Sequence, residues 1–256
     1  MVDIHCHILP GLDDGPETLK ESLEMAEAAI ADGITHVVAT PHSSNEFAFD
    51  YPRIRELRDE VQEKIGHGLT LATGCDFHLN PENLEALAVD APRFCINQLN
   101  YLLVEFSDYS IPPSMDQTLH ELRLAGLRPI ITHPERNPIL HANPGRLTKW
   151  AELGCYIQVT GGSITGGFGK KAQADSLQWI SQGLVHFVAS DAHNMRQRPL
   201  RLQPAFAAVR DQFGEEKARA LFTDNPGAAF EGRELPHVPD LAANGKSPHR
   251  KRFFFF

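Results

Sequence analysis

The sequence is poor in cysteine, and its few cysteines lack the patterns that carry chemistry. Cys6, Cys75, Cys95 and Cys155 show neither Cys-x-x-Cys spacing nor the density of a disulfide framework, so we expect a cytoplasmic location. None of the four is followed six residues later by arginine, which excludes a Cys-x5-Arg loop that binds phosphate beside a nucleophilic thiol. A Walker A loop and a G-x-S-x-G elbow are also absent.

Basic charge and long apolar runs are scarce as well. The chain has 24 Lys and Arg against 33 Asp and Glu, a formal net charge of -9. This balance argues against a nucleic-acid partner, because phosphate backbones are held by clustered basic side chains. No apolar run approaches the roughly 20 residues of a membrane span, and the chain does not open with a signal-peptide pattern. We expect residues 234–256, which hold a basic run and four final phenylalanines, to be a disordered tail; a docking element for a partner or a membrane surface is the alternative.

Short apolar runs alternate with helical patterns over residues 1–233, which we expect to form a single domain. Nearly continuous apolar strands joined by helices predict an α/β fold with a parallel sheet, and this many units suggest closure into a barrel. The clearest helix is expected over Pro16–Asp32, with Pro16 in its first turn and Gly33 as its stop. Seven strands are expected, at Val2–His5, Thr35–Thr40, Leu69–Phe77, Tyr101–Phe106, Arg128–Thr132, Tyr156–Thr160 and Val185–Ser190. Further helices are expected at Pro52–Ile65, Pro81–Leu87, Met115–Ala125, Pro144–Leu153, Lys171–Gln182, Leu202–Phe213 and Glu215–Phe222.

Residue types that bind metals stand at the end of nearly every predicted strand. The carboxyl ends of parallel barrel strands open on one rim, so these residues should converge in space. His-x-His on a strand points both rings to one face, and carboxylates can supply the oxygens that hold two or three divalent ions close together. The groups are His5-Cys6-His7 with Asp13 and Asp14, Thr40-Pro41-His42, Gly74-Cys75-Asp76-Phe77-His78, Val104-Glu105-Phe106, Thr132-His133-Pro134-Glu135-Arg136 and Ser190-Asp191-Ala192-His193. The sixth strand ends instead in Gly161-Gly162-Ser163, where backbone could approach a ligand closely.

Each group has an ordinary structural interpretation when it is taken alone. Asp14 could cap the helix that begins near Pro16, and Asp191 with His193 could be a structural hydrogen-bonded pair. His78 shares a strand face with Asp76 and could support a ligand rather than act as one. Placed together at six strand ends, these residues favour a polynuclear metal centre.

Two arginines, Arg136 and Arg198, follow the ligand groups by a few residues. A guanidinium beside a metal centre is the usual device for gripping phosphate oxygens and stabilising transition-state charge, although each arginine could instead form a surface ion pair. Without a nucleophilic cysteine, a metal-bound hydroxide is the expected nucleophile. From the residues alone the prediction stops at a metal-dependent phosphoesterase or hydrolase.

As an ordered set, these motifs resemble the PHP (polymerase and histidinol phosphatase) superfamily. They look most like the bacterial manganese-dependent tyrosine-protein phosphatases of capsule and exopolysaccharide loci. The resemblance runs from residue 2 to about residue 231 and includes Asp224-Asn225-Pro226. It implies a distorted (β/α)7 TIM-like barrel with a trinuclear centre, and phosphate contacts for Arg136 and Arg198. It implies metal-ligand roles for His5, His7, Asp14, His42, Asp76, Glu105, His133, Asp191 and His193.

The resemblance also implies a substrate: phosphotyrosine on the tyrosine-rich tail of a partner autokinase that controls polysaccharide polymerisation and export. His193 or Asp191 could protonate the leaving group, although both are also candidate ligands. One position departs from the family pattern, because Asp76 stands where a glutamate is usual and must reach the metals with one methylene less.

Other functions remain open at this point. A small-molecule phosphatase of the histidinol-phosphate type or a nuclease-like relative would use the same metals, and the acidic chain argues against the nuclease. An amidohydrolase would also carry His-x-His on its first strand, and a catalytically inactive scaffold would keep the ligands. Phe47, Phe49 and Tyr51 could form a wall for an aromatic leaving group, or could simply pack in the core or the loop. The mixed nitrogen and oxygen ligands would suit Mn, Fe, Zn or Co.

Overall fold

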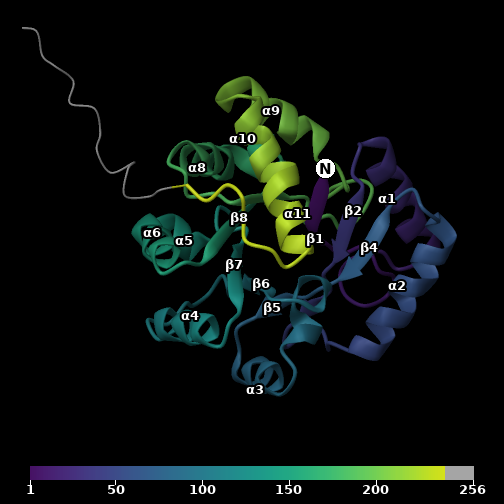
Figure 1. Ribbon diagram of the computed structural model, residues 1–256, viewed down its shortest axis with the longest axis horizontal. Helices are drawn as coiled ribbons and strands as arrows, with labels where there is room; N and C mark the ends of the chain where they lie inside the picture. The colour runs from purple at the N-terminus through teal and green to yellow at the C-terminus, as the bar shows by residue number, and fades with distance from the viewer. Residues whose placement is uncertain (240–256) are drawn as a thin grey trace, which may run out of the picture.

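The computed structural model describes residues 1–239, and in this part of the chain strands and helices alternate as expected (Figure 1). All strand pairs are parallel, and they form a three-stranded sheet in the order β1-β2-β4 and a six-stranded sheet in the order β3-β5-β6-β7-β8-β9. The α/β class with parallel sheets is therefore confirmed. The strands are β1 (Val2–Cys6), β2 (His36–Ala39), β3 (His42–Ser43), β4 (Thr70–Thr73), β5 (Asp76–His78), β6 (Tyr101–Glu105), β7 (Arg128–Thr132), β8 (Tyr156–Thr160) and β9 (Phe187–Ala189).

Nine strands stand in the described residues where seven were predicted, because one predicted strand is divided and another is followed by a short extra strand. The run Thr35–Thr40 ends as β2 before Pro41, which has no backbone N–H for a ladder, and the chain continues as β3. The run Leu69–Phe77 is interrupted at Gly74, where a Cβ would lie 3.0 Å from Cγ1 of Val38. In both places the chain leaves the smaller sheet and joins the larger one.

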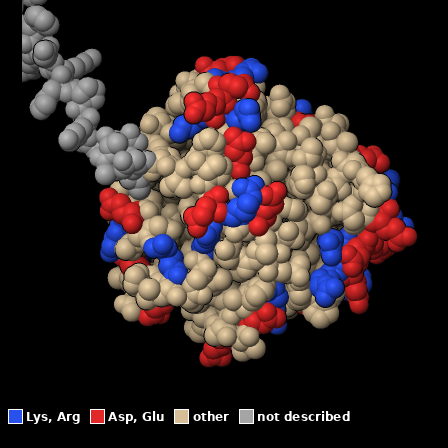
Figure 2. All heavy atoms as spheres, viewed as in Figure 1, with Lys and Arg blue, Asp and Glu red and all other residues tan. Residues whose placement is uncertain are grey.

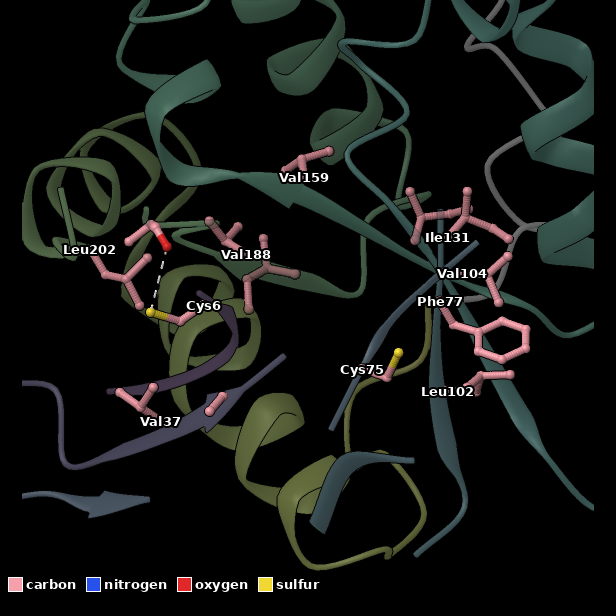
Figure 3. Packing of buried hydrophobic residues seen from close by; sticks show 14 of the residues in the cluster. Cys6, Val37, Cys75, Phe77, Leu102, Val104, Ile131, Val159, Val188 and Leu202 are labelled. Atoms are coloured by element: carbon pink, nitrogen blue, oxygen red, sulfur yellow. Dashed lines mark hydrogen bonds between the residues drawn. The ribbon is translucent and has the colours of Figure 1, made fainter. Parts of the chain in front are cut away.

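The smaller sheet also meets the larger one at β1 and β9. Cys6 and Ala192 form an isolated parallel bridge, and the amide of His7 donates to the carbonyl of Ala192 at 2.9 Å. The amide of Asp191 donates to the carbonyl of His5 at 2.9 Å, and the Cys6 thiol lies 3.8 Å from the Ala192 carbonyl (Figure 3). These contacts hold the ends of the first and last strands side by side.

Helices surround the strands in Figure 1. The first begins at Leu19 rather than at Pro16, because Thr18 and Glu21 form a capping box in which each side chain accepts from the other residue's amide. Asp14 therefore does not cap it. The remaining boundaries agree with the expected helices to within a few residues, and α5, α7 and α11 are helices that the sequence did not predict. The α-helices are α1 (Leu19–Ala31), α2 (Tyr51–Ile65), α3 (Pro81–Val89), α4 (Met115–Leu124), α5 (Pro138–Ala142), α6 (Pro144–Glu152), α7 (Gly161–Ile164), α8 (Gly169–Ser181), α9 (Gln203–Phe213), α10 (Glu215–Arg219) and α11 (Asn225–Phe230). Short 3-10 turns lie at Pro92–Phe94 and Ile96–Gln98, and a π-helical turn spans Ala220–Asp224.

The hydrophobic core is divided between two clusters. The larger one packs strands against the helices, and Figure 3 shows Val104, Ile131, Val159 and Val188 of β6 to β9 within it. The smaller cluster joins residues of both sheets, such as Ile4 and Leu103, to Ala228 of α11. In Figure 1 helix α11 crosses in front of β1 near the N-terminus, so it covers the amino ends of the strands and leaves the carboxyl ends open.

The folded part extends past the predicted boundary at residue 233. Leu235 is buried in the smaller cluster, and the amide of His237 donates to the Asn225 side chain at 3.1 Å. The rest of the predicted tail, residues 240–256, lies outside the described residues. Within the described residues, none of the helices combines the length and apolar character needed to cross a bilayer. On the face shown in Figure 2, basic and acidic side chains are interspersed rather than gathered into a basic patch.

Candidate metal centre

The nine predicted ligands converge at the carboxyl ends of the strands. In the described part of the chain their ligand atoms form four overlapping groups, and within each group the atoms lie within 4.8 Å of one another. The groups share members, which is the arrangement that a cluster of neighbouring ions requires. They are His7, Asp14, His42 and His193; His5, His7 and Asp76; His5, His133 and Asp191; and His42, Asp76 and Glu105.

In each ring of the His-x-His motif, one nitrogen contacts a neighbouring side chain and the other nitrogen faces the cluster. His7 Nδ1 lies 2.7 Å from Asp13 Oδ2, and its Nε2 lies 3.4 Å from Nε2 of His5. His5 Nδ1 lies 3.0 Å from Oε1 of Gln158 on β8. A partner on the outer nitrogen fixes the ring orientation and leaves the inner lone pair available to an ion.

Asp76 lies at the centre of the cluster despite its short side chain. Its Oδ2 is 3.3 Å from His5 Nε2, 3.5 Å from His42 Nδ1 and 3.8 Å from His133 Nε2. Asp76 Oδ2 and Asp191 Oδ1 are buried and have no hydrogen-bond partner in the structure. Buried carboxylate oxygens without a donor are costly unless a cation satisfies them, so the residues present fit a group of divalent ions.

The negative charge of the carboxylates in the cluster raises the pKa values of two of its histidines. Burial lowers the pKa of His5, but Asp76 and Asp191 outweigh it and raise the pKa to about 9. Burial likewise opposes protonation of His42, yet hydrogen bonds to Asp14 and Glu105 raise its pKa to about 11. Both shifts have the same cause, an excess of carboxylate charge that metal cations would neutralise.

His7 differs from these two rings. Burial, with repulsion from His193, lowers the pKa of His7 to about 4, so the ring is neutral and can offer its inner nitrogen to an ion. His78 supports the cluster from its edge, because its Nε2 lies 2.9 Å from Oε2 of Glu105. His78 is therefore placed as a residue that holds a candidate ligand, as its strand position suggested.

Two candidate ligands have strained backbone. His133 has a φ of 33° and Asp191 a φ of 51°, values that L-residues rarely adopt. Each is the first or second residue after its strand, β7 or β9, where the chain must turn while the side chain faces the rim. Strain of this kind persists where the surrounding structure fixes the residue, and it concentrates at functional sites.

Both predicted arginines reach the cluster through one carboxylate. Nη2 of Arg136 and Nη2 of Arg198 each donate to Oδ2 of Asp191. The Nε atoms of both arginines are buried without a hydrogen-bond partner, and both side chains line a pocket of about 300 Å³ together with the candidate ligands Asp14, His133 and Asp191. The loop that carries Arg198 is folded around Asn194, whose Oδ1 accepts from the amides of Arg196, Gln197 and Arg198.

A cleft of about 680 Å³ opens beside the cluster and includes Asp14, His42 and Glu105 in its lining. Phe47 forms part of its wall and is nearly parallel to the His42 ring, with centroids 5.7 Å apart and planes at 15°. Phe49 does not line this cleft; its ring stacks on Phe94 at 4.7 Å.

Tyr51, like Phe49, is absent from the lining of the cleft, and its ring faces Phe49 at 6.3 Å. Of the three aromatic residues predicted to line the cleft, only Phe47 does so; Phe106 and Tyr109, which were not predicted, also line it. The predicted glycine-rich segment Gly161-Gly162-Ser163 begins α7, and Gly161 and Gly162 line a separate pocket of about 210 Å³ whose lining includes Arg198.

Sequence reasoning missed two residues that orient the ligands. Asp13 was grouped with Asp14 without a role, although its carboxylate holds His7 and also accepts from the amide of His42 at 3.0 Å. Gln158 was not considered, although an amide side chain inside the apolar run Tyr156–Thr160 is a signal that the strand faces something polar.

Parallel βα units with His and carboxylate ligands at the carboxyl ends of the strands are the combination typical of metal-dependent hydrolases on barrel-like folds. Within that class, residues 1–231 match the family model described as capsular polysaccharide synthesis, CpsB/CapC. The chain belongs to this family, which confirms the resemblance drawn from its motifs.

The relatives agree with this membership over nearly the whole chain. Tyrosine-protein phosphatase YwqE of Bacillus subtilis is 35% identical and is covered, like this chain, over 100% of its length. The putative tyrosine-protein phosphatase CapC of Staphylococcus aureus is 36% identical, with 80% of this chain and 82% of CapC covered. The chain also superposes on a crystal structure from a study of YwqE and of CpsB from Streptococcus pneumoniae, which are described there as unique metal-dependent tyrosine phosphatases. The TM-score is 0.85 at 36% identity, and the superposition covers 92% of this chain and 96% of the other.

A more distant likeness concerns the fold alone. The histidinol phosphate phosphatase of Lactococcus lactis is 12% identical with a TM-score of 0.56, over 87% of this chain and 96% of that one. At this identity the superposition supports a shared architecture and carries no statement about substrate.

Proposed function

We propose that this protein is a metal-dependent protein-tyrosine phosphatase. The observation that carries the proposal is the meeting of nine ligand residues and two arginines at one rim, in a chain whose relatives are named tyrosine-protein phosphatases. The ligand residues are those of the four overlapping groups, and the arginines are Arg136 and Arg198. The relatives of 35% and 36% identity described above are named tyrosine-protein phosphatases, whereas the histidinol phosphate phosphatase is 12% identical.

The finer architecture forms part of the proposal. We infer that the two sheets together make one distorted barrel of seven βα units in a single domain, which extends past residue 233 to the packed residues Leu235 and His237. The Cys6–Ala192 bridge supports closure on one side, and the passage of the chain from β2 to β3 and from β4 to β5 supports it on the other. The resident ions are proposed to be manganese, two or three per chain, since mixed imidazole and carboxylate donors suit it, as they would Fe, Zn or Co.

Divalent ions in this site would supply Lewis-acid chemistry, polarising the phosphate and activating water. The protein's own part is to grip and orient the phosphate. Arg136 and Arg198 offer guanidinium donors beside the cluster, where they can follow the charge that develops on the phosphoryl oxygens. Asp191 holds both guanidinium groups in place through its Oδ2.

The charge state of Asp191 bears on the choice of substrate. Burial favours its protonated form, but Arg136, His5 and Arg198 hold the pKa of this carboxyl well below its usual range, so it stays ionised. An ionised Asp191 has no proton to give to the departing oxygen. Phenols have a pKa near 10 and leave more readily than alkoxides, which favours phosphotyrosine over phosphoserine and phosphothreonine.

The shape of the site favours the same choice. The phosphate of phosphotyrosine stands at the end of a long rigid ring, and the cleft next to the metal cluster has room for the ring with peptide on either side. Phe47 offers an aromatic face at the inner end of that cleft, beside His42. The shorter side chains of phosphoserine and phosphothreonine would draw the peptide backbone into the surrounding loops.

The natural substrate is proposed to be the phosphorylated tyrosine-rich tail of a partner kinase in polysaccharide synthesis. The description of the family and the names of its members support the pathway and the residue, and the kinase itself rests on the resemblance. A cytoplasmic location is supported by the four free cysteines of the described chain, all buried as thiols.

The test compares kcat/KM for matched phosphotyrosine, phosphoserine and phosphothreonine peptides, and for histidinol phosphate, with manganese-loaded protein. We expect phosphotyrosine to be preferred by at least about a hundredfold, given its better leaving group. Phe47→Ala should raise KM for the phosphotyrosine peptide. It should change the Ki of inorganic phosphate less, because inorganic phosphate lacks a ring. Equal or better turnover of histidinol phosphate would replace this proposal with a small-molecule phosphatase.

A further inference from the structure

Phe168 lies in a glycine-rich loop between α7 and α8 and is 36% exposed. The guanidinium carbon of Arg136 lies over this ring, 4.6 Å from its centroid. We propose that Phe168 is a positioning residue: it fixes the plane of the Arg136 guanidinium so that its free donors face the substrate phosphate. The inference rests on the proposed function, in which Arg136 contacts that phosphate.

The loop is built to place this ring. A Cβ on Gly162 would lie 2.9 Å from Cε2 of Phe168, so only glycine leaves room for the ring where it stands. The amide of Gly167 donates to the carbonyl of Gly162 at 2.8 Å, and Gly166 and Gly169 have φ values of 87° and 89°. These features fold the loop back on itself and turn Phe168 toward Arg136.

The residue before Arg136 ties the two segments together. Glu135 is fully buried, and its Oε1 accepts from the amide of Thr160 at 2.9 Å and from the hydroxyl of Ser163 at 2.7 Å. The chain that carries Arg136 is thus anchored to the start of the loop that carries Phe168. The arginine and its aromatic partner are set in one rigid unit, in which the distance between them depends on short local connections.

The arginine has a specific need for such a partner. Arg136 Nη2 is engaged by Asp191, while its Nε is buried without a hydrogen-bond partner. A long side chain held at one nitrogen can still rotate about that contact. This rotational freedom must be lost when the transition state forms, at a cost in conformational entropy. An aromatic face removes this rotation in advance without occupying any N–H donor.

The experiment is a double-mutant cycle between Phe168 and Arg136, with kcat/KM for a phosphotyrosine peptide and metal content measured for every variant. Phe168→Ala and Phe168→Leu should each lower kcat/KM roughly tenfold, mainly in kcat, with metal content unchanged. Phe168→Trp should restore most of the activity because it restores an aromatic face. In the Arg136→Ala background, Phe168→Ala should have almost no further effect.

Gly162→Ala provides a second variant that displaces the ring without removing it, and we expect a loss in the same direction. Leu124→Ala on α4, also exposed but remote from the rim, is the matched control. Equal losses from Phe168→Ala in the wild-type and Arg136→Ala backgrounds, or full activity of Phe168→Leu, would overturn the inference. A wild-type protein inactive on phosphotyrosine peptides would instead refute the proposed function.

Discussion

Replacing Asp76 with Asn should remove more metal than any change at the edge of the cluster. Asp76 belongs to two of the four ligand groups, whereas Asp14 belongs to one and is half-exposed. Asn keeps the size of the side chain and removes its charge, so the comparison isolates electrostatics. We expect Asp76→Asn to lose at least two ions per chain and Asp14→Asn to lose one.

The size of the effect follows from the distances. Unit charges 3.3 Å apart, the separation of Asp76 Oδ2 and His5 Nε2, attract by about 5 kcal/mol at an effective dielectric constant near 20. A divalent ion bound to His5 carries two charges, so its attraction to the Asp76 carboxylate is at least as large. Since about 1.4 kcal/mol is a factor of ten in Kd, removing this carboxylate should weaken binding of the ion by at least about a thousandfold. Phosphatase activity should fall with the metal content.

The assay is metal analysis of protein loaded with Mn²⁺ and separated from free ions by gel filtration, with kcat measured on the same samples. Circular dichroism serves as the control for folding. If Asp76→Asn retained the metal content of the wild type, or lost no more than Asp14→Asn, Asp76 would not be shared between ions. Asp76→Glu, which keeps the carboxylate, should keep the ions.

Three further outcomes are expected. Arg136→Ala should lower kcat by about a hundredfold or more while metal content stays constant, as for a lost transition-state contact; parallel loss of metal would assign it a structural role. Excess chelator should abolish activity while iodoacetamide spares it, because the described cysteines are buried; activity that survives verified metal loss would contradict the mechanism. Burial lowers the pKa of His186 to about 4, so the folded state resists a proton that the unfolded state takes up near pH 6.5. The contribution of His186 to the stability of the metal-free protein is therefore complete above pH 6.5 and should fall by about 2–3 kcal/mol toward pH 4, a loss that His186→Asn should largely remove in urea titrations; identical pH profiles of the two proteins below pH 6.5 would refute it.

The convergence of the candidate ligands at one rim could be predicted because it depends only on the order and direction of the strands. Parallel strands end at one edge, so residues far apart in the sequence, such as His5 and Asp191, meet wherever the strands are parallel. The start of α1 also follows from a local signal, since Thr18 followed three residues later by Glu21 is a capping-box signature. It places the start at Leu19, so the predicted start at Pro16 is wrong. Local signals of this kind need only the neighbouring residues.

Side-chain partners on distant strands could not be predicted in the same way. Gln158 holds His5 from a strand 153 residues away in sequence, and only the register of the sheets sets that pairing. Phe49 and Tyr51 stand two and four residues after Phe47, yet they face other residues because α2 begins at Tyr51 and redirects the chain. The direction of a loop side chain depends on where the next element packs, which composition does not encode.

The division of the strands into two sheets gives the candidate ligands a role in folding as well as in chemistry. His5 belongs to the three-stranded sheet, while Asp76 and Glu105 belong to the six-stranded sheet, so an ion shared among such ligands would cross-link the two. Ions that bind only the assembled sheets raise the free energy of unfolding by about 4 kcal/mol at a thousand times their Kd. The melting temperature should then rise with free Mn²⁺, and hydrogen exchange of the amides at the β1–β9 junction should slow as Mn²⁺ is added.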